Sequence, residues 1–308
     1  MSDFLGNNLL VVDGLNLCFR WKHDKYVVPE NELNDVSFED ALEFLREDMA
    51  EHYFKEELVD TINSIAASYK ASKIVLLADF GQSKWRSEIY PEYKGNREAD
   101  RAKNRPCDNA AFRVFFEAYS EAIKEIADED SGIEVIFEKG IEADDVAAFI
   151  CNNVVDNYDH IWMVTSDKDW DLLITDKVSR FNWMTKKTWK NIDKTGPRPR
   201  EITLENWNQH YKHSPEQHLG VKALMGDTGD NLPGIDGIGP VYALKLLEKY
   251  NGLAGVLKAL PIKSTAKYIA NLNANKELVI KNVLLMDINS SLDKVIPPAF
   301  AERILATL

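Results

Sequence analysis

The stretch Leu9-Leu10-Val11-Val12-Asp13-Gly14 joins four consecutive apolar residues to an aspartate and a glycine. A short apolar run of this kind is typical of a strand that is buried on both faces of a parallel sheet. Residues 73–78 repeat the pattern and are followed by Asp79, and residues 133–137 and 161–165 are followed by further acids. We therefore expect four strands, each of which presents carboxylates at its C-terminal end.

Helical patterns separate these strands, over residues 38–69, 108–127 and 143–155. Alternating strands and helices predict an α/β fold in which a mostly parallel sheet is covered on both faces. Ligands of such sheets bind outside the carboxyl ends of the strands, which is the edge where the acids should converge. After residue 200 the sequence becomes helical, with breaks at Gly226, at the 233–239 run and at Gly252.

The bulk composition indicates a globular protein that acts away from membranes. Of its 308 residues 45% are hydrophobic, and no apolar run approaches the roughly 18 residues of a transmembrane helix. Residues 1–8 carry Asp3 and no basic stretch, so we do not expect a signal peptide. Cys18, Cys107 and Cys151 are widely spaced, which predicts free thiols in a reducing cytoplasm.

The net charge of −13 is unevenly distributed. Residues 30–60 hold twelve carboxylates against two basic residues, which gives −10 for that segment alone. Residues 84–113 carry eight basic and five acidic residues (+3), and residues 180–212 carry eight and three (+5). A polyanion responds to local charge, so the negative total does not exclude a nucleic-acid partner.

Nine acids form the candidate metal-binding set. They follow the predicted strands or precede the glycine-rich run: Asp13, Asp79, Glu142, Asp144, Asp145, Asp167, Asp169, Asp227 and Asp230. Any one of them is explained equally well as a helix N-cap. The set is not, because like charges this close repel one another and raise their pKa values unless a cation is present. Carboxylates without nearby His or Cys select Mg²⁺ or Mn²⁺, and nine suit two ions better than one.

A basic loop leaves the sheet edge directly after Asp79. It contains the run Pro91-Glu92-Tyr93-Lys94-Gly95-Asn96-Arg97, followed by three more basic residues before residue 106. A solvated loop is the simpler interpretation of such a charge run, but this one starts beside a candidate metal ligand. Tyr93 next to Lys94 suits base stacking beside a phosphate. Arg20 and Lys22 could serve the same groove, although Arg20 could equally pair with an acid.

The run Pro233-Gly234-Ile235-Asp236-Gly237-Ile238-Gly239-Pro240 lies between two helical patterns. Gly237 and Gly239 allow a backbone approach to phosphate, and Pro240 suits the first turn of a helix whose N–H groups face an anion. An ordinary tight turn between helices explains the run equally well. Asp227 and Asp230 lie just upstream and connect it to the acidic set.

These stretches together resemble the flap endonuclease and 5′-nuclease family, most closely the phage 5′–3′ exonucleases. The resemblance rests on residues 11–17, 91–97, 141–145, 165–171 and 225–231 with the glycine run, and it spans about residues 9–290. It implies a PIN-like nuclease core over residues 1–200, with a helical arch at about 82–120. It also implies a helical module over 201–308 containing a helix–two-turn–helix at about 215–250, which grips duplex DNA and is expected to hold a monovalent cation.

The resemblance also implies roles for individual residues. Asp79, Glu142, Asp144 and Asp145 would surround a first metal ion, and Asp167, Asp169, Asp227 and Asp230 a second, with Asp13 nearby. Lys94 and Arg97 would contact the scissile phosphate, Tyr93 would belong to the arch that handles the 5′ end, and Lys222 would lie near the DNA path. Two departures stand out: residues 24–60 are longer and more acidic than the phage pattern, and Pro240-Val241-Tyr242 replaces basic residues after the hairpin.

We therefore expect a monomeric, structure-specific 5′ nuclease that uses two or more Mg²⁺ ions, with Mn²⁺ as a substitute. Its substrates would be 5′ flaps, nicked or gapped duplexes and free 5′ ends, including those of RNA primers. Two rival functions are a PIN-type ribonuclease, which does not need the glycine run, and a non-catalytic DNA-binding scaffold, which would lack some of the acids.

The acidic segment 30–60 carries a second pattern. Its apolar residues Phe38, Leu42, Leu45, Met49 and Phe54 recur at mostly three- and four-residue intervals, which predicts one face of an amphipathic helix. The simpler interpretation is that this face packs on the sheet and the acids face solvent. The alternative is that the acidic face recruits a basic partner or repels DNA towards the arch.

Overall fold

The computed structural model describes residues 6–25, 33, 36–52, 54–183 and 200–308. A six-stranded sheet with the order β3-β2-β1-β4-β5-β6 forms its centre. The strands are β1 (Asn8–Asp13), β2 (Ala71–Leu77), β3 (Ile133–Ile136), β4 (His160–Val164), β5 (Val178–Phe181) and β6 (Glu201–Ile202). Only β6 pairs antiparallel to its neighbour, so the prediction of a mostly parallel sheet is confirmed.

Strand β1 lies at the middle of the sheet because its apolar side chains are buried on both faces. Leu9, Leu10, Val11 and Val12 are completely buried. Leu10 and Val12 belong to the apolar core on one face, whereas Leu9 and Val11 belong to the core on the other. The alternation follows from the two-residue period of a strand. The strand pairs with β2 and β4, so Asp13 at its end comes between the acids that follow those two strands.

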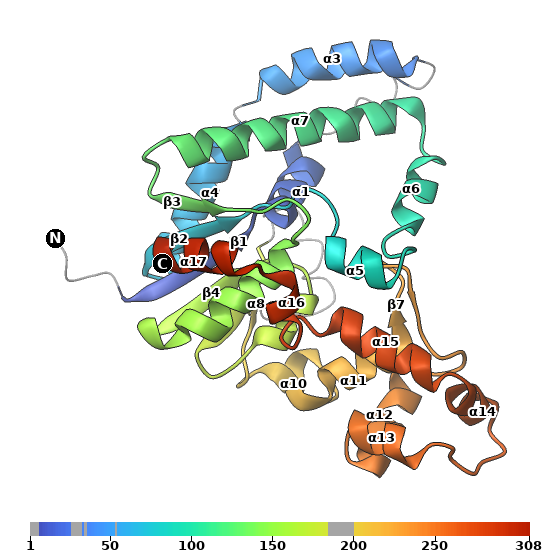
Figure 1. Ribbon diagram of the computed structural model, residues 1–308. Helices are drawn as coiled ribbons and strands as arrows, with labels where there is room; N and C mark the ends of the chain where they lie inside the picture. Colours follow the sequence, from blue (N-terminus) through green and yellow to red (C-terminus); the bar gives the residue numbers. More distant parts are fainter. Residues whose placement is uncertain (1–5, 26–32, 34–35, 53, 184–199) are drawn as a thin grey trace.

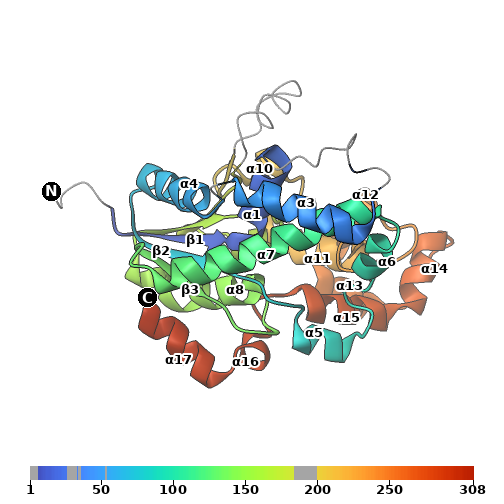
Figure 2. The same cartoon turned by 90° about the horizontal axis from the view of Figure 1, so that it is seen from above.

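Helices cover both faces of the sheet (Figures 1 and 2). One face packs against α1 (Gly14–Lys25), α4 (Phe54–Ser68) and α7 (Pro106–Asp128), and α3 (Phe38–Ala50) joins the same apolar core. The other packs against α8 (Ala143–Val154), the 3-10 helices η1 (Val155–Asn157) and η2 (Asp169–Leu173), α10 (Trp207–His210), α16 (Leu292–Val295) and α17 (Pro298–Thr307). The four predicted strands and the helices predicted over 108–127 and 143–155 are present within a few residues, but β5 and β6 were not predicted.

Two short helices carry the basic loop away from the sheet. They are α5 (Lys84–Ile89) and α6 (Asn96–Arg101), and α6 connects to the long helix α7 at the side of the molecule (Figure 1). Arg105 caps α7, and Pro106 occupies its first turn, where a missing N–H costs nothing. The excursion that starts after Asp79 is therefore a helical one, as predicted for residues 82–120.

The C-terminal helices form a compact group beside the acidic edge. The group comprises α11 (Pro215–Met225), the two-stranded ribbon β7 (Gly226–Asp227) and β8 (Leu232–Pro233), α12 (Pro240–Tyr250), α13 (Leu253–Ala259), α14 (Lys267–Ala274) and α15 (Lys276–Met286). These helices enclose an apolar core of their own, centred on Leu224, Leu246 and Leu272. The predicted pair of helices joined by a glycine hairpin is present as α11 and α12.

The predicted division at residue 200 differs from the packing. Strand β6, at residues 201–202, completes the central sheet, and residues 288–304 pack in the same core as β1 and α8. The chain thus returns to the sheet after building its C-terminal helices. Helical periodicity alone could not reveal this, because it does not specify which surface a helix packs against.

The acidic segment forms two helices rather than one continuous helix from 38 to 69. Helix α3 buries Ala41, Leu42, Leu45 and Met49, and it lies along α7 rather than on the sheet (Figure 2). Its acids face outward, as the simpler interpretation predicts. Of the segment's residues, 30–32, 34–35 and 53 lie outside the described part of the chain.

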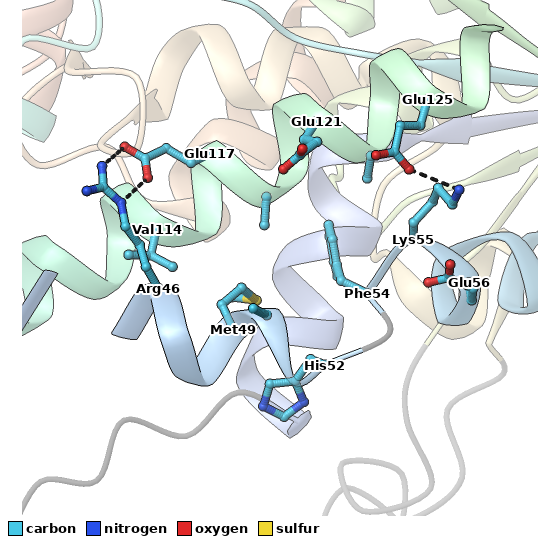
Figure 3. Close-up of a pocket in the computed structure, with 13 residues that line it drawn as sticks. Arg46, Met49, His52, Phe54, Lys55, Glu56, Val114, Glu117, Glu121 and Glu125 are labelled. Atoms are coloured by element: carbon cyan, nitrogen blue, oxygen red, sulfur yellow. Dashed lines mark hydrogen bonds and ion pairs between the residues drawn. The ribbon is translucent and has the colours of Figure 1, made fainter. Parts of the chain in front are cut away.

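Ion pairs join the acidic helices to α7 at both ends of a cleft of about 390 Å³ (Figure 3). Arg46 of α3 contacts Glu117 with two bonds of 2.8 Å, and Lys55 of α4 lies 2.9 Å from Glu125. These pairs are exposed and contribute little on their own, on the order of 1 kcal/mol or less each. The buried apolar face of α3 is therefore its main attachment.

All three cysteines are buried and free, which confirms the prediction of unpaired thiols. Within the part of the chain that the structure describes, no helix is both long and apolar enough to cross a bilayer.

Truncating the apolar face of α3 tests this attachment. Leu45→Ala should lower the free energy of unfolding by about 2–5 kcal/mol, because Leu45 is completely buried and its loss leaves a cavity. Glu47→Ala on the exposed face of the same helix is the control and should change stability by less than about 0.5 kcal/mol. Urea unfolding measures both, and equal effects of the two changes would contradict the packing described here.

Candidate active site

The nine acids of the candidate set lie around the C-terminal edge of the sheet. Asp13 ends β1, Asp79 follows β2, Asp167 follows β4 and Asp169 begins η2. Glu142 caps α8, and Asp144 and Asp145 lie in its first turn. Asp227 and Asp230 belong to the β7–β8 ribbon and its loop, which the C-terminal helices bring to the same edge. The acids that follow the strands therefore converge at one edge, as predicted, and two acids of the C-terminal helices join them there.

Four of these carboxylates are buried or partly buried and lack a basic partner. Among the described residues, no lysine or arginine forms an ion pair with Asp13, Asp79, Asp144 or Asp167. They accept uncharged hydrogen bonds instead: Asp13 from Thr165 Oγ1 at 2.7 Å, Asp79 from the Ala143 N–H at 2.6 Å, and Asp144 from Trp170 Nε1 at 2.6 Å.

Burial and mutual repulsion raise the pKa of all four. The pKa of Asp13 rises to about 7 through burial and the charge of Asp79. That of Asp79 rises to about 6 through burial and the charge of Glu142. Burial and the charge of Asp167 raise the pKa of Asp144, and Asp167 itself rises to about 6 through burial and Asp169. Keeping these groups ionised together costs free energy, and the charge of a bound multivalent cation would offset that cost.

The donor set therefore fits hard divalent cations. All candidate ligands are carboxylate oxygens, and no His or Cys lies among them. As the side chains stand, no three acids of the described residues converge closely enough to hold one ion. Two lysines contribute to this spacing, because Lys94 lies against Glu142 and Lys222 against Asp169.

Glu142 is held by donors that all come from residues 83–94. Its Oε1 accepts from Lys94 Nζ at 2.6 Å and from the Ser83 N–H at 3.3 Å. Its Oε2 accepts from the Tyr93 hydroxyl at 3.0 Å and from Arg86 at 3.5 Å. Burial raises the pKa of Glu142, but Lys94 and Arg86 outweigh it and bring the pKa below its usual range. The basic loop and the acidic edge are thus one connected structure.

Lys94 occupies a backbone conformation that a lysine rarely adopts. Its φ is +57°, in the left-handed region that costs a non-glycine residue about 1–2 kcal/mol. The conformation is maintained because its N–H donates to the Asp230 carbonyl at 3.0 Å, while its ammonium reaches Glu142 and lies 3.8 Å from Asp230. Backbone strain of this kind is typical of functional positions.

A second acidic cluster surrounds Lys222 of α11. Its ammonium contacts Asp169 and lies 3.6 Å from Asp227. Burial lowers the pKa of Lys222, but Asp169 outweighs that effect and the pKa is raised.

Arg97 of α6 contacts Asp230 at 3.2 Å and remains half exposed. Lys222 was predicted near the DNA path, and its position is inside the acidic site itself.

Two predicted residues occupy different surroundings from those expected. Asp145 accepts two bonds from Arg86, at 2.6 and 2.8 Å, so both of its oxygens are engaged by one guanidinium. Tyr93 is only 3% exposed, and its hydroxyl bridges Glu142 and Asp230. Charge and loop position suggested a metal-ligand role for Asp145 and a stacking role for Tyr93, and both roles stay predictions.

A cavity of about 580 Å³ lies beside Asp79, between the sheet edge and the helices that leave it. Phe19, Phe112 and Phe116 form its apolar wall, and Arg97 and Arg101 lie on its polar side. Arg20 and Lys22 are half-buried on α1, and neither lines this cavity. Burial lowers the pKa of Lys22, and the charge of Asp108 opposes that shift.

The glycine hairpin presents an open backbone edge. Gly237 has a φ of +84°, and a Cβ there would lie 3.2 Å from Tyr268. Gly239 has an ordinary φ of −99° and precedes Pro240 at the start of α12, and a Cβ there would meet nothing within 4 Å. The backbone at the N-terminus of α12 is therefore accessible to an anion of moderate size. In place of the expected basic residues, Tyr242 stacks on Tyr268 with ring centroids 4.3 Å apart.

Sequence reasoning missed several residues that hold the acids in place. Thr165 donates to Asp13, Trp170 donates to Asp144, and Asn16 accepts from the Ser166 N–H and hydroxyl. Arg86 was counted only as part of a basic run. Arg180 was also counted as part of a basic patch, yet it is buried against Asp171 at 2.5 Å. Much of that patch, residues 184–199, lies outside the described residues.

Comparison with protein families gives two matches that cover most of the chain. Residues 8–197 match the family described as 5′-3′ exonuclease, N-terminal resolvase-like domain, and residues 213–300 match 5′-3′ exonuclease, C-terminal SAM fold. A flap endonuclease of Escherichia phage T5 is 34% identical over 282 residues, covering 91% of this chain and 83% of that protein. A 5′-3′ exonuclease of Bacillus subtilis is 28% identical, covering 83% and 75%.

Solved structures show the same similarity over nearly the whole chain. The T5 D15 protein crystallised with metal ions superposes with a TM-score of 0.78 at 32% identity, covering 98% of this chain and 99% of that one. The bacteriophage T5 D15 flap endonuclease in a complex with DNA and metal ions superposes with a TM-score of 0.79 at 33% identity and the same coverage.

The raised pKa values predict how stability depends on pH without metal. An aspartate whose folded-state pKa lies above its usual 3.8 holds its proton more tightly in the folded state, so the fold loses stability as pH rises from the usual pKa to the folded one. The metal-free protein should therefore lose stability between about pH 4 and pH 7. Saturating Mn²⁺ should remove most of that loss, and Asp167→Asn should reduce it. Thermal unfolding in EDTA and in Mn²⁺ measures this, and a flat metal-free profile would contradict the repulsion described here.

Proposed function

This chain belongs to the 5′-3′ exonuclease family, and on that premise we propose that its acidic sheet edge hydrolyses phosphodiester bonds with two divalent metal ions. The protein is a metal-dependent, structure-specific 5′ nuclease of the flap endonuclease type. The observation that carries the proposed site is the set of buried or partly buried carboxylates that have no ion-pair partner among the described residues, close to a basic helical excursion. Keeping such carboxylates ionised together costs free energy unless bound cations balance their charge.

We divide the proposed metal ligands between two ions. Asp79, Glu142 and Asp144 would hold one ion, and Asp167, Asp169, Asp227 and Asp230 the other, with Asp13 beside both. We propose Mg²⁺ as the physiological ion and Mn²⁺ as a substitute, because the ligands are all carboxylates. When bound, such ions activate a water and stabilise the leaving oxygen of an in-line displacement.

The lysines then act as movable cations. In the absence of DNA, Lys94 and Lys222 neutralise Glu142 and Asp169. When ions take over that neutralisation, each ammonium is free to turn towards a phosphate. Lys94 and Arg97 would contact the scissile phosphate, because both reach Asp230 at the mouth of the site. Cations held beside the reacting phosphate stabilise charge that develops in the transition state.

The cavity beside Asp79 suits the 5′-terminal nucleotide of the substrate. Its aromatic wall offers stacking surfaces, and Arg97 and Arg101 offer charge to the backbone. On the other side of the site, the open hairpin at Gly239 suits the backbone of a duplex. The substrate would then run from the C-terminal helices, across the metals, towards the arch.

The substrates proposed for this chain are 5′ flaps, nicked or gapped duplexes and free 5′ ends, with RNA primers on DNA as a further class. A related T5 flap endonuclease has been crystallised with DNA and metal ions. A PIN-type ribonuclease would not need the α11–α12 hairpin, and a non-catalytic scaffold would not need the complete set of acids.

A labelled 5′-flap duplex distinguishes these functions. The protein should cut it near the junction of flap and duplex in Mg²⁺ or Mn²⁺, and EDTA should abolish the products. Asp169→Asn and Asp230→Asn should bind the same substrate without cutting it, since each removes a ligand charge and little volume. Cleavage confined to single-stranded RNA would support the ribonuclease, and binding without cleavage by the unaltered protein would support the scaffold.

Removing the Lys94 charge should reduce turnover while leaving substrate binding largely intact. Lys94→Met should lower single-turnover rate about 100-fold or more, roughly 3 kcal/mol, if its ammonium acts on the scissile phosphate. Lys103→Met is the matched control, because Lys103 is an exposed lysine of the same excursion, paired only with Asp100. A near-normal rate for Lys94→Met would exclude the assignment.

The hairpin is better tested at Gly239 than at Gly237, where the positive φ strains any replacement. Gly239→Val places its side chain in open space and should weaken binding of a duplex-containing flap about tenfold, because it blocks the phosphate from the backbone. Binding of a single strand of equal length should be unchanged, and Gly239→Ala should have a smaller effect. Equal loss on both substrates would count against a duplex-binding role.

A further inference from the structure

Arg86 lies where the base of the arch, the metal-site helix and the C-terminal helices meet. It is 2% exposed, on helix α5. Its Nη1 and Nη2 donate to the two oxygens of Asp145 at 2.6 and 2.8 Å, and its Nε donates to the carbonyl of Leu285 on α15 at 2.9 Å. Its Nη1 also lies 3.5 Å from Glu142. One side chain of α5 therefore contacts two other segments, the start of α8 and α15, that are far apart in the sequence.

The geometry of the guanidinium makes this junction specific. A planar fork binds a carboxylate through two parallel bonds and still has Nε free for a third partner, which a lysine ammonium cannot reproduce. Both side chains of the Arg86–Asp145 pair are at most 3% exposed, so neither can be left unpaired without a large penalty. The pair consequently holds α5 and α8 in one relative position.

Asp145 shares the first turn of α8 with two proposed metal ligands. Glu142 caps the helix and Asp144 precedes Asp145 directly. Fixing Asp145 therefore fixes the direction in which the other two carboxylates point. Ser83, at the start of α5, adds a bond from its N–H to Glu142, so α5 holds this turn at two points.

On its other side, Arg86 is tied to the helix that supports the hairpin. Asn282 lies one turn before Leu285 on α15 and is completely buried. Its amide donates to the carbonyls of Ala223 at the end of α11 and Pro233 at the start of the hairpin, at 3.0 and 2.8 Å. Helix α15 thus holds the hairpin through Asn282 and the arch base through Leu285.

We propose that Arg86 is a positioning residue that sets Glu142 and Asp144 in register with the C-terminal helices. It acts through Asp145 and the Leu285 carbonyl and touches no substrate. This inference rests on the proposed function, in which Glu142 and Asp144 hold a metal ion and the hairpin holds the duplex. In this proposal Asp145 serves as the partner of Arg86 and does not bind the metal ion.

Arg86→Lys tests the inference because it keeps the charge and removes the fork. At saturating 5′-flap substrate, kcat should fall roughly 10- to 100-fold, as expected for residues that orient metal ligands. KM should stay within about threefold, since no substrate contact is lost. The Mn²⁺ concentration that half-saturates the thermal shift should rise, which reports on the site without cleavage. Arg303→Lys, an exposed arginine paired with Glu138, is the matched control and should change neither quantity.

A double-mutant cycle separates the two roles of Asp145. If Asp145 acts only through Arg86, Asp145→Asn added to Arg86→Lys should cause little further loss of kcat or of Mn²⁺ affinity. Additive losses would show an independent role for Asp145, and an unchanged kcat and Mn²⁺ midpoint in folded Arg86→Lys would overturn the inference. If Arg86→Lys does not fold, Asp145→Glu, which keeps the charge and shifts the fork, is measured by the same two readouts. Failure of the unaltered protein to cut would instead refute the proposed function.

Discussion

The repulsion between carboxylates gathered at one edge of a parallel sheet is the constraint on which the rest of the structure depends. Asp13, Asp79 and Asp167 follow adjacent strands of the sheet, and Asp144 lies in the first turn of α8 at the same edge. Burial and mutual charge raise their pKa values. Lys94, Lys222 and Arg86 neutralise neighbouring acids, whereas these four have no ion-pair partner among the described residues.

Those basic residues also connect parts of the chain that could otherwise move independently. Lys94 joins the basic loop to α8 and to the β7–β8 loop, and Lys222 joins α11 to η2. A nuclease that recognises a junction must place its metals at a fixed distance from the duplex and from the free 5′ end. The Arg86–Asp145 pair, together with the bond from Arg86 to the Leu285 carbonyl, provides such a fixed distance, because breaking a buried pair is costly.

The acidic helix α3 lies outside this network of ion pairs and packs on α7. Its apolar side lies on α7, the helix that completes the arch, and its charged side faces solvent. The repulsion of DNA by this acidic face stays a prediction. The acids of residues 30–60 account for most of the net charge of −13, so the rest of the chain is close to neutral.

The sequence by itself determined the parallel sheet, the edge at which the acids meet and the presence of the glycine hairpin. Runs such as residues 9–14 specify these features locally, through apolar length, strand period and the residue that ends the strand. Only the tertiary structure decided which acids remain unpartnered. Asp145 and Asp144 are adjacent in the sequence, yet one is bound to Arg86 and the other is not. The distinction depends on burial and on partners 26 to 59 residues away, which no local pattern encodes.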